Sequence, residues 1–196
     1  MRSRFGIPRR ALAWSSLALV CGTLLVAAGC GDKSLILRVD LLSFLSPSEK
    51  TAHYGPIPGG VSDSVTVTPS RSINLLPGIK DITSVSDVTI DAAGTFANTT
   101  GSGTGSVKIF VSAEGTDPFT TDPTPIVLPV TLAPATTDTV SVTIAGDSQL
   151  AALFLGDKAQ LGIRVTLNSA AGPALEGDFT LITLKAIVTA KQNIVN

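Results

Sequence analysis

From residue 34 onward, apolar and polar residues alternate in short runs along the chain. Five tripeptides share the pattern apolar, threonine, apolar, at residues 65–67, 88–90, 130–132, 142–144 and 165–167. Alternation with a period of two places successive side chains on opposite faces of an extended chain, and it is typical of a strand with one buried face. The spacing between the tripeptides is irregular, so they indicate separate strands and not copies of one repeated unit.

The alternating segments predict eight strands. They cover residues 34–44, 64–69, 86–92, 106–114, 125–133, 139–146, 160–169 and 178–190. In segment 106–114, Val107, Ile109 and Val111 form the inward set, whereas Phe110 points to the other side. Pro129 has no backbone donor for the hydrogen bonds of a sheet, so segment 125–133 is expected at a sheet edge or at a bulge.

One segment, residues 147–158, has helical instead of strand periodicity. Leu150 and Leu153 recur at helical spacing, and either Asp147 or Ser148 can cap the first turn. Gly156 suits the position just after a helix, because glycine adopts the left-handed conformation found there. We therefore expect one short helix that crosses between two strands.

Three other stretches are expected to be irregular. The sequence SPSEK, residues 46–50, has the Ser-x-x-Glu spacing of a capping box with proline in the first position, which predicts one helical turn within a loop. Residues 94–106 are rich in Gly, Ser and Thr and predict a long, flexible hairpin loop. The Pro and Gly residues of TAHYGPIPGG, residues 51–60, predict an exposed loop.

Together these elements predict an all-β domain. About eight strands separated by turns favour an antiparallel β-sandwich with one short helix, and a partly closed β-barrel is the alternative. A length of 196 residues allows one domain or two small ones, and we expect a single sandwich over residues 34–196. Hydrophobic residues make up 44% of the chain and charged residues 15%, which is unlike the composition of a disordered chain.

The first 29 residues have the pattern of an export signal. Residues 1–10 are basic, and residues 11–29 are apolar or small. A retained transmembrane helix is the alternative, because 19 mainly apolar residues can span a bilayer. The sequence Val-Ala-Ala-Gly-Cys at residues 26–30 resembles the lipobox of bacterial lipoproteins, in which small residues precede a cysteine, although Ala27 stands where leucine is commonest.

This resemblance implies cleavage between Gly29 and Cys30, lipidation of Cys30 and acylation of the new N-terminus. Several acyl chains are needed for a stable anchor, because one chain holds a protein only marginally. A disulfide is disfavoured, since Cys21 lies in the segment to be removed and leaves Cys30 without a partner. In this family an aspartate directly after the cysteine tends to retain the protein in the inner membrane. Gly31 therefore favours the outer membrane in a cell that has two.

Residues 30–33 are expected to form a short lipid-anchored tether. Only four residues, 31–34, separate Cys30 from the first apolar strand residue, Leu35, and they extend at most about 14 Å. A tether of this reach holds the domain against the headgroups. It favours partners at the membrane surface, such as another envelope protein.

The charge balance argues against a nucleic-acid partner. The whole chain has a formal net charge of −1, but residues 1–29 contain four arginines and no acid. Their removal leaves ten basic and fifteen acidic residues, a net charge of −5. Phosphate contacts need clustered Lys and Arg, and the chain has no such cluster, so we expect no nucleic-acid binding.

Side chains for catalysis are scarce. His53 is the only histidine, and the chain has no GxSxG elbow, so the nucleophile and base of a serine-type enzyme are not indicated. The sequence GSGTGSVK, residues 101–108, has alternating glycines followed by a strand pattern, unlike a phosphate-binding P-loop. We expect no enzyme activity and no cofactor.

Metal and carboxylate chemistry is weakly indicated as well. A zinc site needs more His and Cys than the mature chain holds. Turn segments contain Asp117, Asp122 and Asp138, but the spacing is not that of an EF-hand, and local turns explain these residues more simply. Nothing in the sequence pairs the three glutamates, Glu49, Glu114 and Glu176, as a glycosidase requires.

Four aromatic side chains are expected near the surface, namely Tyr54, Phe96, Phe110 and Phe119. The only tryptophan, Trp14, lies in the export signal, so a mature sugar-binding platform would have to use the other aromatics. Packing is the commoner role for such residues. Tyr54, Phe110 and Phe119 are the candidates for contact with a ligand.

Two functions from different classes fit these observations. The first is a non-catalytic, lipid-anchored envelope protein with a structural or protein-interaction role. The second is a lipid-anchored binding module for a small apolar or glycan ligand. Ligand binding would raise the apparent stability of the folded domain, which distinguishes the second function from the first.

Overall fold

The computed structural model describes residues 33–75, 82–120, 125–156 and 158–192. Within these residues the chain forms nine strands, two short 3₁₀-helices and one α-helix. The strands are β1 (Lys33–Asp40), β2 (Thr51–Ile57), β3 (Ser62–Asn74), β4 (Ile82–Thr100), β5 (Gly103–Ala113), β6 (Ile126–Leu132), β7 (Thr136–Ala145), β8 (Lys158–Ser169) and β9 (Leu175–Gln192). The helices are η1 (Leu41–Phe44), η2 (Pro47–Glu49) and α2 (Ser148–Leu153).

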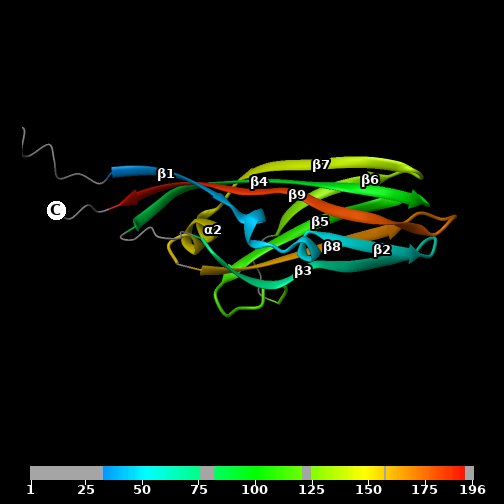
Figure 1. Ribbon diagram of the computed structural model, residues 1–196, viewed down its shortest axis with the longest axis horizontal. Helices are drawn as coiled ribbons and strands as arrows, with labels where there is room; N and C mark the ends of the chain where they lie inside the picture. Colours follow the sequence, from blue (N-terminus) through cyan, green and yellow to red (C-terminus); the bar gives the residue numbers. More distant parts are fainter. Residues whose placement is uncertain (1–32, 76–81, 121–124, 157, 193–196) are drawn as a thin grey trace, which may run out of the picture.

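The strands form two antiparallel sheets that pack face to face (Figure 1). Sheet A has the order β1-β9-β4-β7, with β2 also paired to β9, and sheet B has the order β3-β8-β5-β6. Strands from β3 onward pass repeatedly between the two sheets, which is the arrangement of a double-sheet jelly roll. The predicted antiparallel β-sandwich is therefore confirmed, and the two sheets do not close into the alternative barrel.

The long strand β9 organises sheet A. Its first half pairs with β2, starting at Thr51 opposite Thr180, and its second half pairs with β1, from Asp40 opposite Lys185 to Lys33 opposite Gln192. β1 and β2 thus share one side of β9, with η1 and η2 between them. β1 begins and β9 ends at the same end of the sandwich, and α2 lies in that half of the molecule (Figure 1).

The core lies between the sheets and follows from the alternation of the strands. In β8 and β6 every second residue is buried, including Leu161, Ile163 and Val165. Phe96 of β4 and Phe179 of β9 are fully buried, with ring centroids 4.9 Å apart. Because both sheets and this core lie between residues 33 and 192, residues 31–196 contain the complete sandwich.

The first strand is shorter than predicted. Strand β1 ends at Asp40, and the rest of the expected segment 34–44 forms the 3₁₀-helix η1. The apolar residues there no longer alternate. Leu41 and Leu45, four positions apart, are the buried pair. Neighbouring leucines can pack into the core from a helical turn as well as from a strand, so the order of apolar and polar residues alone did not determine where β1 ends.

Two expected loops are strands. Residues 51–57 of the predicted exposed loop form β2, where Pro56 lies at a break in the register between Tyr54 and Ile57 on the sheet edge. The predicted flexible loop 94–106 is also wrong, because β4 continues to Thr100 and β5 begins at Gly103. A Cβ atom at Gly94 would lie 2.5 Å from the ring of Phe179, so this glycine marks close packing and not flexibility.

The signals for the starts of the helices are confirmed, whereas Gly156 is not the left-handed residue expected after the helix, because α2 already ends at Leu153 and Gly156 has no positive φ. Ser46 and Glu49 form a capping box around η2, and the Asp147 side chain caps α2 by accepting a hydrogen bond from the Leu150 backbone. Pro129 lies in β6, an edge strand of sheet B. These features depend only on neighbours in the sequence, which is why the sequence predicts them well.

Candidate binding pocket

A pocket of about 420 Å³ opens between the two sheets, at the end covered by α2. The end of β5 and the start of β6 form one wall, and the end of β7 forms the other. Ile109 and Ile126, which are opposite each other in the register of β5 and β6, lie at its inner side. The volume is within the range of about 300–1,000 Å³ that is usual for small-molecule sites.

The position of α2 shapes the pocket. The Asp147 carboxylate accepts a hydrogen bond of 2.8 Å from the Leu150 N–H, and the Gly146 N–H donates one of 2.6 Å to the Val88 carbonyl. These two bonds fix the chain where it leaves β7 and turns into the helix. Leu150 and Leu153 then line the pocket.

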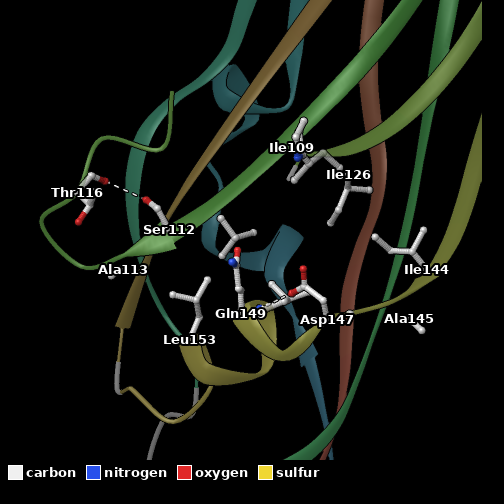
Figure 2. A pocket seen from close by; sticks show the side chains of 14 residues that line it. Ile109, Ser112, Ala113, Thr116, Ile126, Ile144, Ala145, Asp147, Gln149 and Leu153 are labelled. Carbon is white, nitrogen blue, oxygen red and sulfur yellow. Dashed lines mark hydrogen bonds between the residues drawn. The ribbon is translucent and has the colours of Figure 1, made fainter. Parts of the chain in front are cut away.

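The lining is mainly apolar, with a few polar groups. Figure 2 shows Ile126 and Ile144 on the strand side and Gln149 extending from α2 toward β5. The Ser112 hydroxyl already donates to the Thr116 carbonyl over 2.9 Å. By contrast, the Gln149 amide has no hydrogen-bond partner among the residues that the structure describes. An amide can both donate and accept, so the pocket combines apolar walls with one adaptable polar group.

A second, smaller hollow of about 330 Å³ lies on the other side of α2, between the helix and the start of β4. Val85 and Val88 of β4 and Ala151 and Leu155 of the helical segment line it. Leu155 is 51% exposed there. The short helix therefore separates two hollows at the same end of the sandwich.

The residues proposed from the sequence are not at this pocket. Gly29 and Cys30, the cleavage and lipidation positions, and Asp122 lie outside the described residues. Tyr54 and Phe96 were expected near the surface, and this is wrong, because they are 1% and 0% exposed. They alternate inward on β2 and β4, where the sheet partner β9 and the opposite sheet cover them.

Phe110 and Phe119 are partly exposed, as expected, but they lie on the outer face of sheet B. Their ring centroids are 5.4 Å apart, and the guanidinium carbon of Arg164 lies 4.4 Å from the centroid of Phe119. The prediction that Val107, Ile109 and Val111 face inward is confirmed by their burial. Phe110 consequently points away from the core, as the alternation requires.

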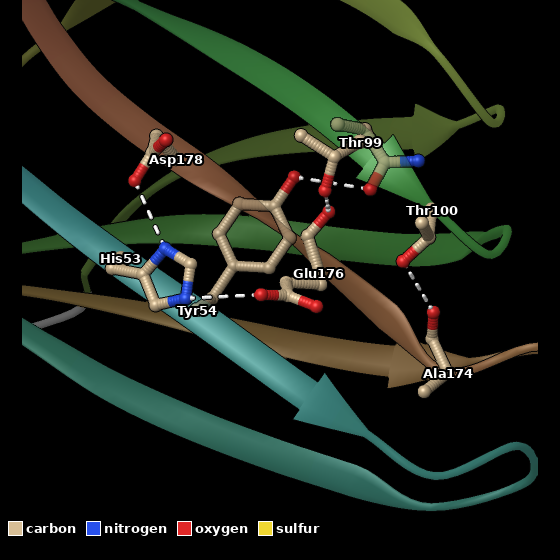
Figure 3. A network of polar contacts seen from close by, with 8 residues as sticks. His53, Tyr54, Thr99, Thr100, Ala174, Glu176 and Asp178 are labelled. Atoms are coloured by element: carbon tan, nitrogen blue, oxygen red, sulfur yellow. Dashed lines mark hydrogen bonds and ion pairs between the residues drawn. The ribbon is translucent and has the colours of Figure 1, made fainter.

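His53 lies between two carboxylates on the surface of sheet A (Figure 3). Its Nδ1 is 3.1 Å from Asp178 Oδ1, and its Nε2 is 3.6 Å from Glu176 Oε1. The expected exposure of His53 is confirmed, since 57% of its side chain is accessible, although the residue lies on a strand. The sequence does not indicate this grouping, because it forms only when β2 pairs with β9.

Tyr54 lies directly beneath this surface. Its hydroxyl donates to Asn98 Oδ1 over 3.4 Å, and the Asn98 amide donates to the carbonyls of Gly101 and Ala133. Burial, with the charges of Asp178 and Asp138, raises the pKa of Tyr54 to about 12. Its hydroxyl is therefore protonated in neutral solution and acts as a hydrogen-bond donor within the sheet.

Two further properties of the described residues bear on function. No group of three His, Cys, Asp or Glu side chains among them is arranged to hold a metal ion. No helix within the described ranges has the length and apolar character needed to cross a membrane.

The sequence did not indicate the pocket itself. It did predict a crossing helix within residues 147–158, where the structure has the shorter α2 (Ser148–Leu153), and it placed Leu150 and Leu153 of the lining on that helix. The sequence does not predict the gap between Ile126 of sheet B and Ile144 of sheet A that forms the pocket, because this gap depends on how the two sheets are placed against each other.

The chain was compared with known proteins. No family model and no curated protein matches it. Among solved structures, a chain from the structure of infectious bursal disease virus Gx strain has a TM-score of 0.42 and 11% identity, over 84% of this chain and 37% of that one. A chain from the Gt strain of the same virus has a TM-score of 0.34 and 11% identity, over 83% of this chain and 38% of that one.

Proposed function

We propose that this protein is a non-catalytic, lipid-anchored module of the cell envelope that binds a small apolar ligand in the pocket beside α2. The observation that carries the proposal is the pocket of about 420 Å³, with largely apolar walls and a Gln149 amide that has no hydrogen-bond partner within the described part of the chain. Apolar walls with a few placed polar groups are the usual composition of ligand sites.

The lining also indicates the class of ligand. Ile109, Ile126, Ile144 and Leu153 present only hydrocarbon, so a ligand gains mainly from removal of its apolar surface from water. The one charged side chain of the lining, Asp147, is engaged in capping α2. A neutral ligand with an apolar body and one group that can hydrogen-bond to an amide fits this arrangement best.

The test is binding of Nile red, a neutral apolar dye, to residues 31–196. We expect saturable binding and a raised melting temperature, because a ligand of the folded state stabilises it by about 2.7 kcal/mol at 100 times Kd. The variant Ala113→Trp places a large ring at an exposed position of the pocket lining and should weaken binding by about tenfold or more. The matched control Ala171→Trp, at an exposed turn between β8 and β9, should bind like the parent protein. Equal binding by both variants would refute the pocket assignment.

The anchor is the second part of the proposal and rests on the lipobox resemblance at residues 26–30. The short tether would place the end of the sandwich that carries α2 toward the membrane, since β1 begins in that half. Replacement Cys30→Ala should abolish fatty-acid labelling in cells and leave a full-length precursor. Normal labelling or processing of this variant would contradict lipidation at Cys30.

A structural or protein-interaction role is the second candidate function. It is supported by Ile36 of β1, an apolar side chain that is 67% exposed close to the proposed tether. In-cell crosslinking of the tagged, lipidated protein tests this role. One stoichiometric envelope partner that is lost in Ile36→Ser would support it, whereas an unchanged set of products would argue against it.

A further inference from the structure

The outer face of sheet B carries two cationic side chains side by side. Lys108 of β5 is directly opposite Arg164 of β8 in the antiparallel register, and both side chains are partly exposed. Like charges directly opposite each other in neighbouring strands destabilise a sheet. Neither side chain forms an ion pair with any carboxylate of the described residues. The middle of this sheet therefore holds two positive charges that form no ion pair with a carboxylate of the described residues.

The strand positions next to this pair are uncharged. In the register of sheet B, Thr66 and Val127 extend the row of Arg164 and Lys108 to the two edge strands. Side chains that alternate with the buried ones point outward. Around the pair these outward positions hold mainly serine and threonine. The adjacent row consists of Ser64, Thr166, Ser106 and Pro129.

An aromatic ring holds Arg164 in place. The guanidinium carbon lies 4.4 Å from the centroid of Phe119, within the range of a cation–π interaction. Phe119 can lie on the sheet because residue 162 is glycine, since a Cβ atom there would come within 2.7 Å of Phe119 Cζ. The segment after β5 thus folds back over the outer face of the sheet and restrains the guanidinium. A restrained guanidinium loses less conformational entropy when it binds an anion.

We propose that this surface, which we call the basic face and define as Lys108, Arg164, Phe119, Ser106 and Thr166, binds an acidic polysaccharide through its carboxylate groups. Arginine recognises a carboxylate with two parallel hydrogen bonds, and lysine adds a point charge one strand away, about 5 Å in backbone spacing. Neighbouring hydroxyls can bond to sugar hydroxyls. A polysaccharide chain that crosses from β5 to β8 meets both cations.

An anionic membrane surface is the less favoured occupant. Each basic residue near such a surface adds only a modest attraction, and the basic face has only two. The mature chain carries a net charge of −5, so a large anionic surface repels most of the domain. A single polysaccharide chain lying on the sheet needs to meet only the two cations, and not the whole acidic surface of the domain.

The experiment measures binding of residues 31–196 to polygalacturonate by affinity electrophoresis, with neutral dextran and vesicles of phosphatidylglycerol as comparisons. We expect retardation by polygalacturonate alone, and a loss of affinity of about tenfold in both Lys108→Gln and Arg164→Gln. Arg164→Lys should bind less well than the parent protein, because it keeps the charge but loses the two-fold hydrogen bonding.

The matched control is Lys158→Gln, which removes one charge from β8, where Lys158 Nζ lies 3.2 Å from Glu114 Oε1. This variant should keep the parent affinity. Melting temperatures show that the variants are folded, and Lys108→Gln should melt no lower than the parent protein because repulsion with Arg164 is relieved. The proposal is overturned by equal binding to dextran, by an equal loss in Lys158→Gln, by binding to vesicles instead, or by no binding to polygalacturonate. The pocket variant Ala113→Trp should bind polygalacturonate normally, so the two sites can fail independently.

Discussion

Tyr54 is the only tyrosine in the chain, so the absorbance of its phenolate reports the ionisation of one residue. Its side chain is 1% exposed, and its hydroxyl donates to Asn98 Oδ1. Burial is the main reason that its pKa is raised to about 12, and the carboxylates of Asp178 and Asp138 add to the effect. Ionisation of Tyr54 in the folded protein therefore requires strongly alkaline solution.

The raised pKa has a direct consequence for stability. A tyrosine in an unfolded chain has a pKa of about 10, lower than the value of about 12 in the folded protein, and this difference corresponds to roughly 3 kcal/mol of stability. The pKa is higher in the folded state, so this contribution is complete below a pH of about 10. It is lost as the pH rises from about 10 through about 12, because the unfolded chain releases its proton first.

The assay compares urea unfolding of residues 31–196 with that of Tyr54→Phe between neutral and strongly alkaline pH. Lysines also titrate in this range, so the difference between the two proteins isolates Tyr54. At neutral pH the variant should be about 1 kcal/mol less stable, since Asn98 Oδ1 loses its donor. At alkaline pH this order should reverse. A phenolate midpoint near 10 while circular dichroism still shows a folded protein would refute the argument.

Three further substitutions test separate parts of the fold by urea unfolding. Gly101→Ala should cost more than about 1 kcal/mol, because φ is +68° and the new Cβ would lie 2.5 Å from the Ala174 carbonyl oxygen; an unchanged midpoint would contradict this. Asp147→Ala should cost about 1 kcal/mol through loss of the α2 cap and should also weaken Nile red binding, and a stable variant with normal binding would argue against the capped helix as a wall of the pocket. Hydrogen bonds from Ser46 lower the pKa of the Glu49 carboxyl below its usual value, so the stability that this ionised carboxylate contributes is lost as the pH falls through the lowered pKa. Glu49→Gln should remove this part of the dependence of stability on acid, and an unaltered acid unfolding profile would contradict the argument.

Features that depend on neighbouring residues could be predicted from the sequence. Alternation located eight of the nine strands in their approximate places and assigned Val107, Ile109 and Val111 to the core. The capping residues marked the starts of η2 and α2, and Pro129 marked an edge strand. Each of these rests on a local rule of backbone geometry or hydrogen bonding, which acts the same way wherever the segment lies in the fold.

Features that depend on distant partners were missed. Glycine and proline in residues 51–60 and 94–106 suggested loops, because both residues are common in turns. In the folded chain, Gly94 makes room for the Phe179 ring, and Pro56 is tolerated at a break in an edge strand. The same residues serve flexible turns and tight packing, and only the neighbour that approaches them decides which applies.

The sequence by itself determined that this protein is built of strands with one crossing helix, because period-two alternation and helix caps are local properties of the chain. Only the tertiary structure decided which side chains meet. The pairing of β9 with β1, β2 and β4 buried Tyr54 and placed His53 between Glu176 and Asp178. The pairing of β5 with β8 set Lys108 opposite Arg164, and the gap between the two sheets left the pocket open. These contacts join residues far apart along the chain, and no local pattern specifies the register and offset that bring them together.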